Sequence, residues 1–143
     1  MTWDGAFPFV TLSCLRASGT KQQFEVRVEG VNQGDVWFYY AKPLPPENQG
    51  EETYFASVKR VGQDLWQTEG LNNDLPKQFH GCGITRALIP QIAIHRSARI
   101  RSSRHRPAEG ETRTEDATKV WRRMVDEGLA RYDSAEDRFY HPA

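Results

Sequence analysis

A glycine-rich segment near the middle of the chain has the composition of an anion-binding loop. Gln78-Phe79-His80-Gly81-Cys82-Gly83 fits the pattern Gln/Arg-x-x-Gly-x-Gly/Ala and stands directly before an apolar segment with helical spacing. Glycines let consecutive backbone N–H groups point at one ligand, and a helix that begins there adds a positive partial charge. The segment therefore predicts a pyrophosphate site that needs no basic side chain. A plain structural turn is the alternative.

The residues before this loop predict an antiparallel meander of four or five β-strands. Residues 24–28 alternate apolar and polar side chains, and residues 7–15 are rich in β-branched and aromatic residues. Residues 42–52 contain three prolines and are predicted to form a loop. The expected strands are 7–15, 24–28, 36–40, 54–61 and 65–69.

The residues after the loop predict two helices. Residues 84–95 have apolar positions at helical spacing, and Pro90 is expected to kink or end that helix, since proline costs about 3 kcal/mol inside a helix. Thr112-Arg-Thr-Glu115 resembles a capping box that starts the second helix, which is expected to reach about Glu127 and to end at Gly128. Short strands are expected at 98–102, 129–133 and 138–141, the last two as a hairpin.

The loop and the order of these elements resemble the Gcn5-related N-acetyltransferase (GNAT) family. In that family the loop pattern binds the pyrophosphate of acyl-coenzyme A, after a strand meander and before a helix, a strand, a second helix and closing strands. The segment Ala117-x-x-Val-Trp121, with Gly128-Leu129 after it, resembles the family's helix that ends in Gly-Phe. The resemblance covers roughly residues 54–141.

This resemblance implies a single α+β domain over residues 1–143, with a β-meander at 1–71 and a coenzyme-binding half at 72–143. It implies a mixed, mostly antiparallel sheet that splays at the loop, with two main helices packed on it. The implied reaction is direct acetyl transfer from acetyl-CoA, a co-substrate, to an amine, without a metal. The residues expected to bind the coenzyme are Gln78, Phe79, His80, Gly81, Cys82, Gly83, Ile84, Thr85 and Arg86.

The resemblance also suggests catalytic residues. Glu69 stands where the family often has a carboxylate that takes the amine proton through water, and Tyr132 and His105 are candidate acids. Each could instead be a packing or surface residue. Trp121 occupies the place of a family tyrosine that protonates the departing thiolate, and tryptophan cannot act as that acid. Cys82 is expected to be a small filler, since direct transfer needs no covalent intermediate.

The short connection between the first two strands leaves no room for the two helices that cover the acceptor site in the family. An open site favours a bulky acceptor, such as a protein or peptide amine. A second subunit is the alternative cover, and the aromatic strand 36–40 offers an apolar surface for a homodimer.

Positive charge is concentrated in the second half of the chain. Residues 1–74 hold 6 basic and 10 acidic side chains, whereas residues 75–143 hold 13 and 9. One basic run is interpreted as a solvated face, as recognition of a coenzyme phosphate or acidic acceptor, or as a nucleic-acid contact. The run comprises Arg96, Arg99, Arg101, Arg104, His105 and Arg106.

A non-catalytic binding module is the rival hypothesis, either a degenerate GNAT fold or a winged-helix nucleic-acid binder. The second helix and the closing hairpin resemble a recognition helix and wing. A winged helix needs two helices close before them, and a strand and a loop intervene here. We therefore do not expect nucleic acid as a partner.

Composition favours a soluble, globular, cytoplasmic protein. Hydrophobic residues make up 38% and aromatic residues 11%, enough for a core, and the net charge of zero excludes a polycation. No segment approaches the roughly 18 apolar residues of a membrane-spanning helix, so no membrane partner is expected. Cys14 and Cys82 have no metal-site spacing and are too few for a disulfide framework.

Overall fold

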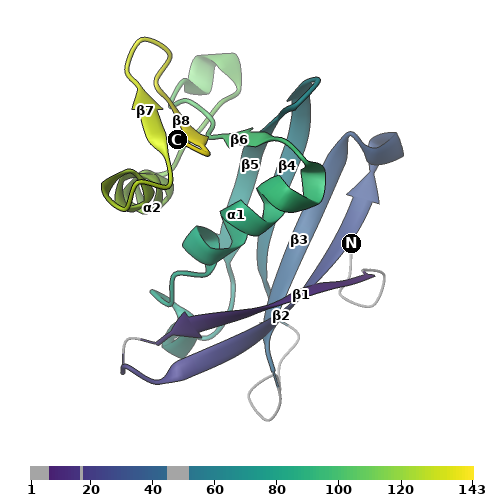
Figure 1. Ribbon diagram of the computed structural model, residues 1–143, viewed down its shortest axis with the longest axis vertical. Coiled ribbons are helices and arrows are strands. Elements are labelled where there is room, and N and C mark those ends of the chain that lie inside the picture. Colours follow the sequence, from purple (N-terminus) through teal and green to yellow (C-terminus); the bar gives the residue numbers. More distant parts are fainter. Residues whose placement is uncertain (1–6, 17, 45–51) are drawn as a thin grey trace.

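The computed structural model describes residues 7–16, 18–44 and 52–143, and in these residues eight strands form one sheet. The strand order is β1-β2-β3-β4-β5-β6-β8-β7, and β5–β6 is the parallel pair (Figure 1). The strands are β1 Phe7–Leu15, β2 Lys21–Val31, β3 Val36–Pro43, β4 Tyr54–Gly62, β5 Leu65–Asn73, β6 Arg99–Arg101, β7 Arg131–Asp133 and β8 Arg138–His141. The helices are α1 Ile84–Arg96 and α2 Glu115–Asp126. The predicted α+β class, with a mixed, mostly antiparallel sheet and two helices, is confirmed.

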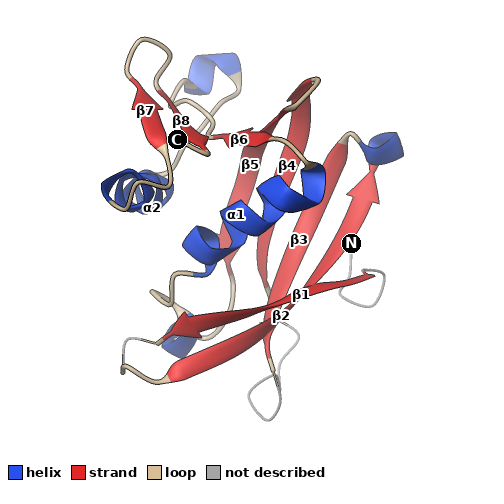
Figure 2. Cartoon of the chain, in the orientation of Figure 1, coloured by secondary structure: helices blue, strands red, loops and turns tan. Residues whose placement is uncertain are grey.

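Strands β1 to β5, which follow one another in residues 7–73, form the predicted antiparallel meander (Figure 2). In β2 the side chains of Phe24, Val26 and Val28 are buried at every second position, which explains the alternation in the sequence. Several strands are longer than predicted: β2 begins at Lys21, β3 ends at Pro43 and β5 ends at Asn73. Backbone pairing with neighbouring strands extends them beyond the segments that alternate.

Helix α1 lies across one face of the twisted sheet and closes the main core (Figure 1). Leu88, Ile89 and Ile92 are buried on its inner side. The predicted helix is confirmed, and Pro90 does not end it, because α1 continues to Arg96. Proline lacks the N–H that would bond four residues back, and the buried apolar face offsets that single loss.

Helix α2 packs against α1 and β7 and begins later than predicted. Its N-cap is Thr114, whose Oγ1 accepts a hydrogen bond from the Ala117 N–H at 3.1 Å, so the capping box starting at Thr112 was placed two residues too early. The fully buried Trp121 stacks on Phe139 with ring centroids 5.9 Å apart. Gly128, at φ 77°, follows the helix in the left-handed conformation.

Strands β5 and β6 diverge soon after they pair. Their ladder comprises only residues 65–67 of β5 and 99–101 of β6, whereas β5 continues to Asn73. A β-bulge at Glu69 marks the same region, because Val58 lies opposite Thr68 and Ser57 lies opposite Gly70. Among the described residues, the outer edge of β5 beyond Gln67 therefore has no strand partner.

Candidate functional site

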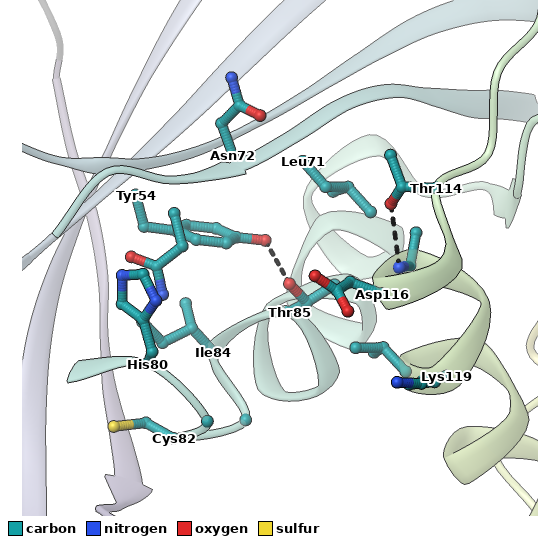
Figure 3. Close-up of a pocket in the computed structure, with 15 residues that line it drawn as sticks. Tyr54, Leu71, Asn72, His80, Cys82, Ile84, Thr85, Thr114, Asp116 and Lys119 are labelled. Carbon is teal, nitrogen blue, oxygen red and sulfur yellow. Dashed lines mark hydrogen bonds between the residues drawn. The ribbon is translucent and has the colours of Figure 1, made fainter. Parts of the chain in front are cut away.

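A cavity of about 570 Å³ lies between the last part of β5, the glycine-rich loop and the first turns of α1 and α2 (Figure 3). The strands contribute Tyr54 and Leu71 to its wall, and α1 contributes Thr85. Helix α2 contributes Asp116 and Lys119, one negative and one positive side chain. The cavity thus borders the unpaired edge of β5 on one side and the start of α1 on another.

The glycine-rich loop beside this cavity has backbone N–H groups without an acceptor among the described residues. Gly81 and Gly83 have φ values of 72° and 77°, which other residues adopt only at a cost. Among the described residues, no group accepts a hydrogen bond from the backbone N–H groups of residues 81–86, and α1 has no side-chain N-cap. Six consecutive N–H donors at a helix start form a favourable environment for an anion.

A second cavity of about 430 Å³ lies on the other side of the loop. Residues 81–83 line both cavities, and Cys14, Arg86 and Arg123 line only the second. Arg86 Nη1 also bonds Glu127 Oε2 at 2.6 Å, which joins the first turn of α1 to the end of α2. A ligand bound to the loop would therefore have arginine side chains on one side and the larger cavity on the other.

The structure places the nine residues predicted to bind coenzyme in four different environments. Those that line the first cavity are His80, Gly81, Cys82, Gly83, Ile84 and Thr85. Arg86 lines the second cavity. Phe79 is buried and packs edge-on against Phe24 in the core, and Gln78 is exposed and lines neither cavity.

Two of the cavity-lining groups are held in their neutral forms. Burial raises the pKa of the Cys82 thiol, although the charge of Arg16 opposes the increase. Burial also raises the pKa of Tyr54, although its hydrogen bond with Thr85 opposes this. Cys82 is therefore a thiol rather than a thiolate at neutral pH, which makes it a weak nucleophile.

The three residues predicted to be catalytic do not line the first cavity. Glu69 lies at the bulge of β5, where its carboxylate is 2.6 Å from Lys59 Nζ. Tyr132 Oη donates a hydrogen bond to Asp137 at 2.9 Å, and this bond raises the pKa of the tyrosine. His105 is exposed in the loop after β6. Asp137 also accepts a hydrogen bond from the backbone N–H of His105 at 3.2 Å, so Tyr132 and His105 share one carboxylate partner. Glu69 takes no part in that contact.

Sequence reasoning missed the residues that reach the cavity from outside the loop, namely Tyr54, Asp116 and Lys119. The alternation in β4 gave a usable signal for Tyr54, because its side chain shares a face with the buried Ala56 and Val58. Asp116 and Lys119 are exposed positions of α2 with no distinguishing pattern. Their place at the cavity depends on how α2 packs.

The arginines of the basic run make separate contacts with different aromatic and acidic side chains of the protein. Arg96 lies over the Trp37 ring at 4.0 Å, and Arg99 lies over the Tyr140 ring at 5.0 Å. Arg104 Nε is 3.1 Å from a Glu111 carboxylate oxygen. The run therefore does not form one continuous basic surface.

No protein-family model and no curated protein sequence matches the chain. In the part of the chain that the structure describes, no helix is long and apolar enough to cross a membrane. Within the same residues, no group of three or more His, Cys, Asp or Glu side chains is placed to hold a metal ion.

Proposed function

We propose that the chain is an acyl-CoA-dependent N-acetyltransferase of the GNAT type. One observation carries the proposal: a single cavity is lined both by residues 81–85, whose N–H groups have no acceptor among the described residues, and by residues 71–73 of β5, beyond the end of its pairing with β6. An acyl-CoA donor has an anionic diphosphate, which matches the N–H groups, and a long arm with amide groups, which matches the unpaired strand edge.

The donor would lie with its diphosphate on the loop and its arm in the cavity. The outer edge of β5 beyond Gln67 carries backbone groups without a strand partner in the described residues, so the arm can pair with them as an added strand does. Leu71, Ala117 and Val120 give the cavity apolar wall for the methylene groups of the arm. The thioester would then lie near the bulge at Glu69.

The chemistry would be direct transfer. The amine nitrogen attacks the thioester carbonyl carbon, the carbon–sulfur bond breaks, the nitrogen loses a proton and the thiolate gains one. A backbone N–H re-aimed by the bulge can polarise the carbonyl, and the site contributes chiefly by positioning. Glu69 is the candidate to take the amine proton through water. Trp121 is fully buried and supplies no acid.

The proposed acceptor is a protein or peptide amine. Strands β1 and β2 pair directly along residues 7–15 and 21–28, and in the described residues no helix separates them. With no covering helix there, that side of the site would admit a large acceptor. Transfer of labelled acetyl groups to lysate proteins, but not to polyamines or aminoglycosides, is the expected result.

Calorimetric titration with acetyl-CoA tests the proposed function. We expect micromolar binding, and at one hundred times the dissociation constant a stabilisation of about 2.7 kcal/mol, seen as a rise of several degrees in the melting midpoint. An unchanged midpoint at saturating acetyl-CoA would contradict the proposal. A salt-dependent shift of duplex DNA without coenzyme binding would favour the winged-helix alternative.

The two charges that α2 contributes to the cavity should act in opposite directions. Because Asp116 repels and Lys119 attracts an anionic donor, we expect Asp116→Asn to strengthen acetyl-CoA binding and Lys119→Gln to weaken it. Both side chains are exposed, so each change should be about two- to fivefold at low salt and smaller at 0.5 M salt. Calorimetry at both salt concentrations measures the affinity. If both substitutions changed the acetyl-CoA affinity in the same direction, an anion bound beside these two side chains would be excluded.

A further inference from the structure

A short hydrogen bond joins the sheet to the first turn of α1 inside the cavity. Tyr54 Oη, from β4, lies 2.6 Å from Thr85 Oγ1, from α1 (Figure 3). Tyr54 is 3% exposed, and both residues line the cavity. Tyr54 also belongs to the main hydrophobic core, so the contact lies where the core meets the cavity and the loop with its free N–H groups.

Either hydroxyl can donate in this geometry, and the burial of Tyr54 favours one direction. Within the described residues, Thr85 Oγ1 is the hydrogen-bond partner of the buried Tyr54 hydroxyl. If Thr85 donated, the buried Tyr54 proton would have no acceptor, which is costly. If Tyr54 donates, its proton is satisfied and Thr85 keeps its own proton free.

Tyr54 is the hydrogen-bond partner of the Thr85 hydroxyl, and the described part of the chain provides no second one. A threonine in a helix often donates to a carbonyl of the preceding turn, but no such bond from Thr85 is present in the described residues. A hydroxyl has one proton to donate and two lone pairs to accept with. Thr85 can therefore accept from Tyr54 and donate to a ligand at the same time.

We propose that Tyr54 is a positioning residue. It holds the Thr85 hydroxyl so that this hydroxyl donates a hydrogen bond to the diphosphate of the acyl-CoA substrate. The inference rests on the proposed function and adds to it a side-chain donor beside the backbone N–H groups. Its chemical consequence is selectivity for the diphosphate: Thr85 recognises the phosphate, and Tyr54 acts only through Thr85. The affinity for the acyl-pantetheine part of acyl-CoA does not depend on Tyr54 or Thr85 in this proposal.

The closing experiment compares two ligands on four variants. We expect Tyr54→Phe to weaken acetyl-CoA binding three- to tenfold and Thr85→Val about tenfold, whereas Thr85→Ser should bind as wild type does. S-acetylpantetheine has no phosphate, so its affinity should change less than twofold in each of these variants. NMR titration measures that affinity. Tyr39→Phe is the matched control, because Tyr39 is a buried tyrosine of β3 whose Oη lies 2.7 Å from His95 Nδ1 near the other end of α1. It should leave acetyl-CoA binding unchanged.

The double variant Tyr54→Phe/Thr85→Val completes the test. It should bind acetyl-CoA no more weakly than Thr85→Val alone, because Tyr54 acts through Thr85. Equal losses for both ligands would assign Tyr54 a structural role and overturn the inference, as would independent, multiplying losses in the double variant. Failure of wild-type protein to bind acetyl-CoA would overturn the proposed function itself, whereas normal wild-type binding with an unaffected Tyr54→Phe variant would overturn only the inference.

Discussion

Gly81→Asp should reduce acetyl-CoA binding about 30- to 150-fold while the protein stays folded. An ideal Cβ at Gly81 meets no atom within 4 Å, so the new side chain has room, and the left-handed φ of 72° costs roughly 1 kcal/mol. The new carboxylate would stand among the N–H groups proposed to hold the diphosphate. Repulsion of roughly 2 to 3 kcal/mol at this partly screened site gives the expected loss. Calorimetry on the folded variant measures it.

Two controls separate charge from backbone strain. Gly81→Asn has nearly the same shape and the same tolerance of left-handed φ but no charge, so its affinity should stay within about threefold of wild type. Gly34→Asp places the same carboxylate at another glycine with positive φ, 90°, and open space, between β2 and β3. It should lower stability without changing affinity. Equal affinities of Gly81→Asp and Gly81→Asn for acetyl-CoA would show that no anionic group binds at the loop.

Glu111→Ala should destabilise the protein by about 3 to 5 kcal/mol, a large fraction of the 5 to 15 kcal/mol typical of a domain. The Glu111 carboxylate accepts hydrogen bonds from Gln67 Nε2 at 3.1 Å and from the backbone N–H of Arg104 at 3.2 Å. It also pairs with Arg138, which is 5% exposed, at 2.9 Å. Removing it leaves a buried guanidinium without its counter-charge. Urea unfolding at pH 7 measures the loss.

The same carboxylate makes stability depend on acid pH. Burial alone would raise the pKa of Glu111, but hydrogen bonds from Arg138 and Arg104 outweigh burial and hold it at about 2, below its ordinary value of 4.5. The stabilisation is therefore complete above pH 4.5 and is lost as the pH falls toward 2. Glu111→Gln should show a smaller loss of stability over that window than wild type does.

Glu109→Gln is the matched control for both measurements. Glu109 belongs to the same loop and pairs with Arg104 at 3.0 Å, but its side chain is 51% exposed. Exposed ion pairs contribute less than about 1 kcal/mol, so this variant should unfold nearly as wild type does. Equal unfolding midpoints for Glu111→Ala and wild type would show that the buried cluster contributes nothing to stability.

The elements themselves could be predicted because each depends on neighbours in the sequence. The alternation at 24–28 and the helical spacing after Gly83 each reflect one buried face of a strand or helix. That periodicity can be read from consecutive residues alone. The boundaries could not be predicted as well. Strand β5 continues to Asn73 because of pairing with β4, and Thr114 rather than Thr112 caps α2 because of where the preceding loop ends.

The contacts that define the site join residues far apart in the sequence. Local sequence was enough to predict the order of the strands and helices and a glycine-rich loop with N–H donors at the start of α1. The contact of Tyr54 with Thr85, the bulge at Glu69 and the pairing of Glu111 with Arg138 depend instead on how distant segments pack. Local patterns specify which face of an element is apolar, whereas strand register and helix packing decide which polar side chains meet on the remaining surface.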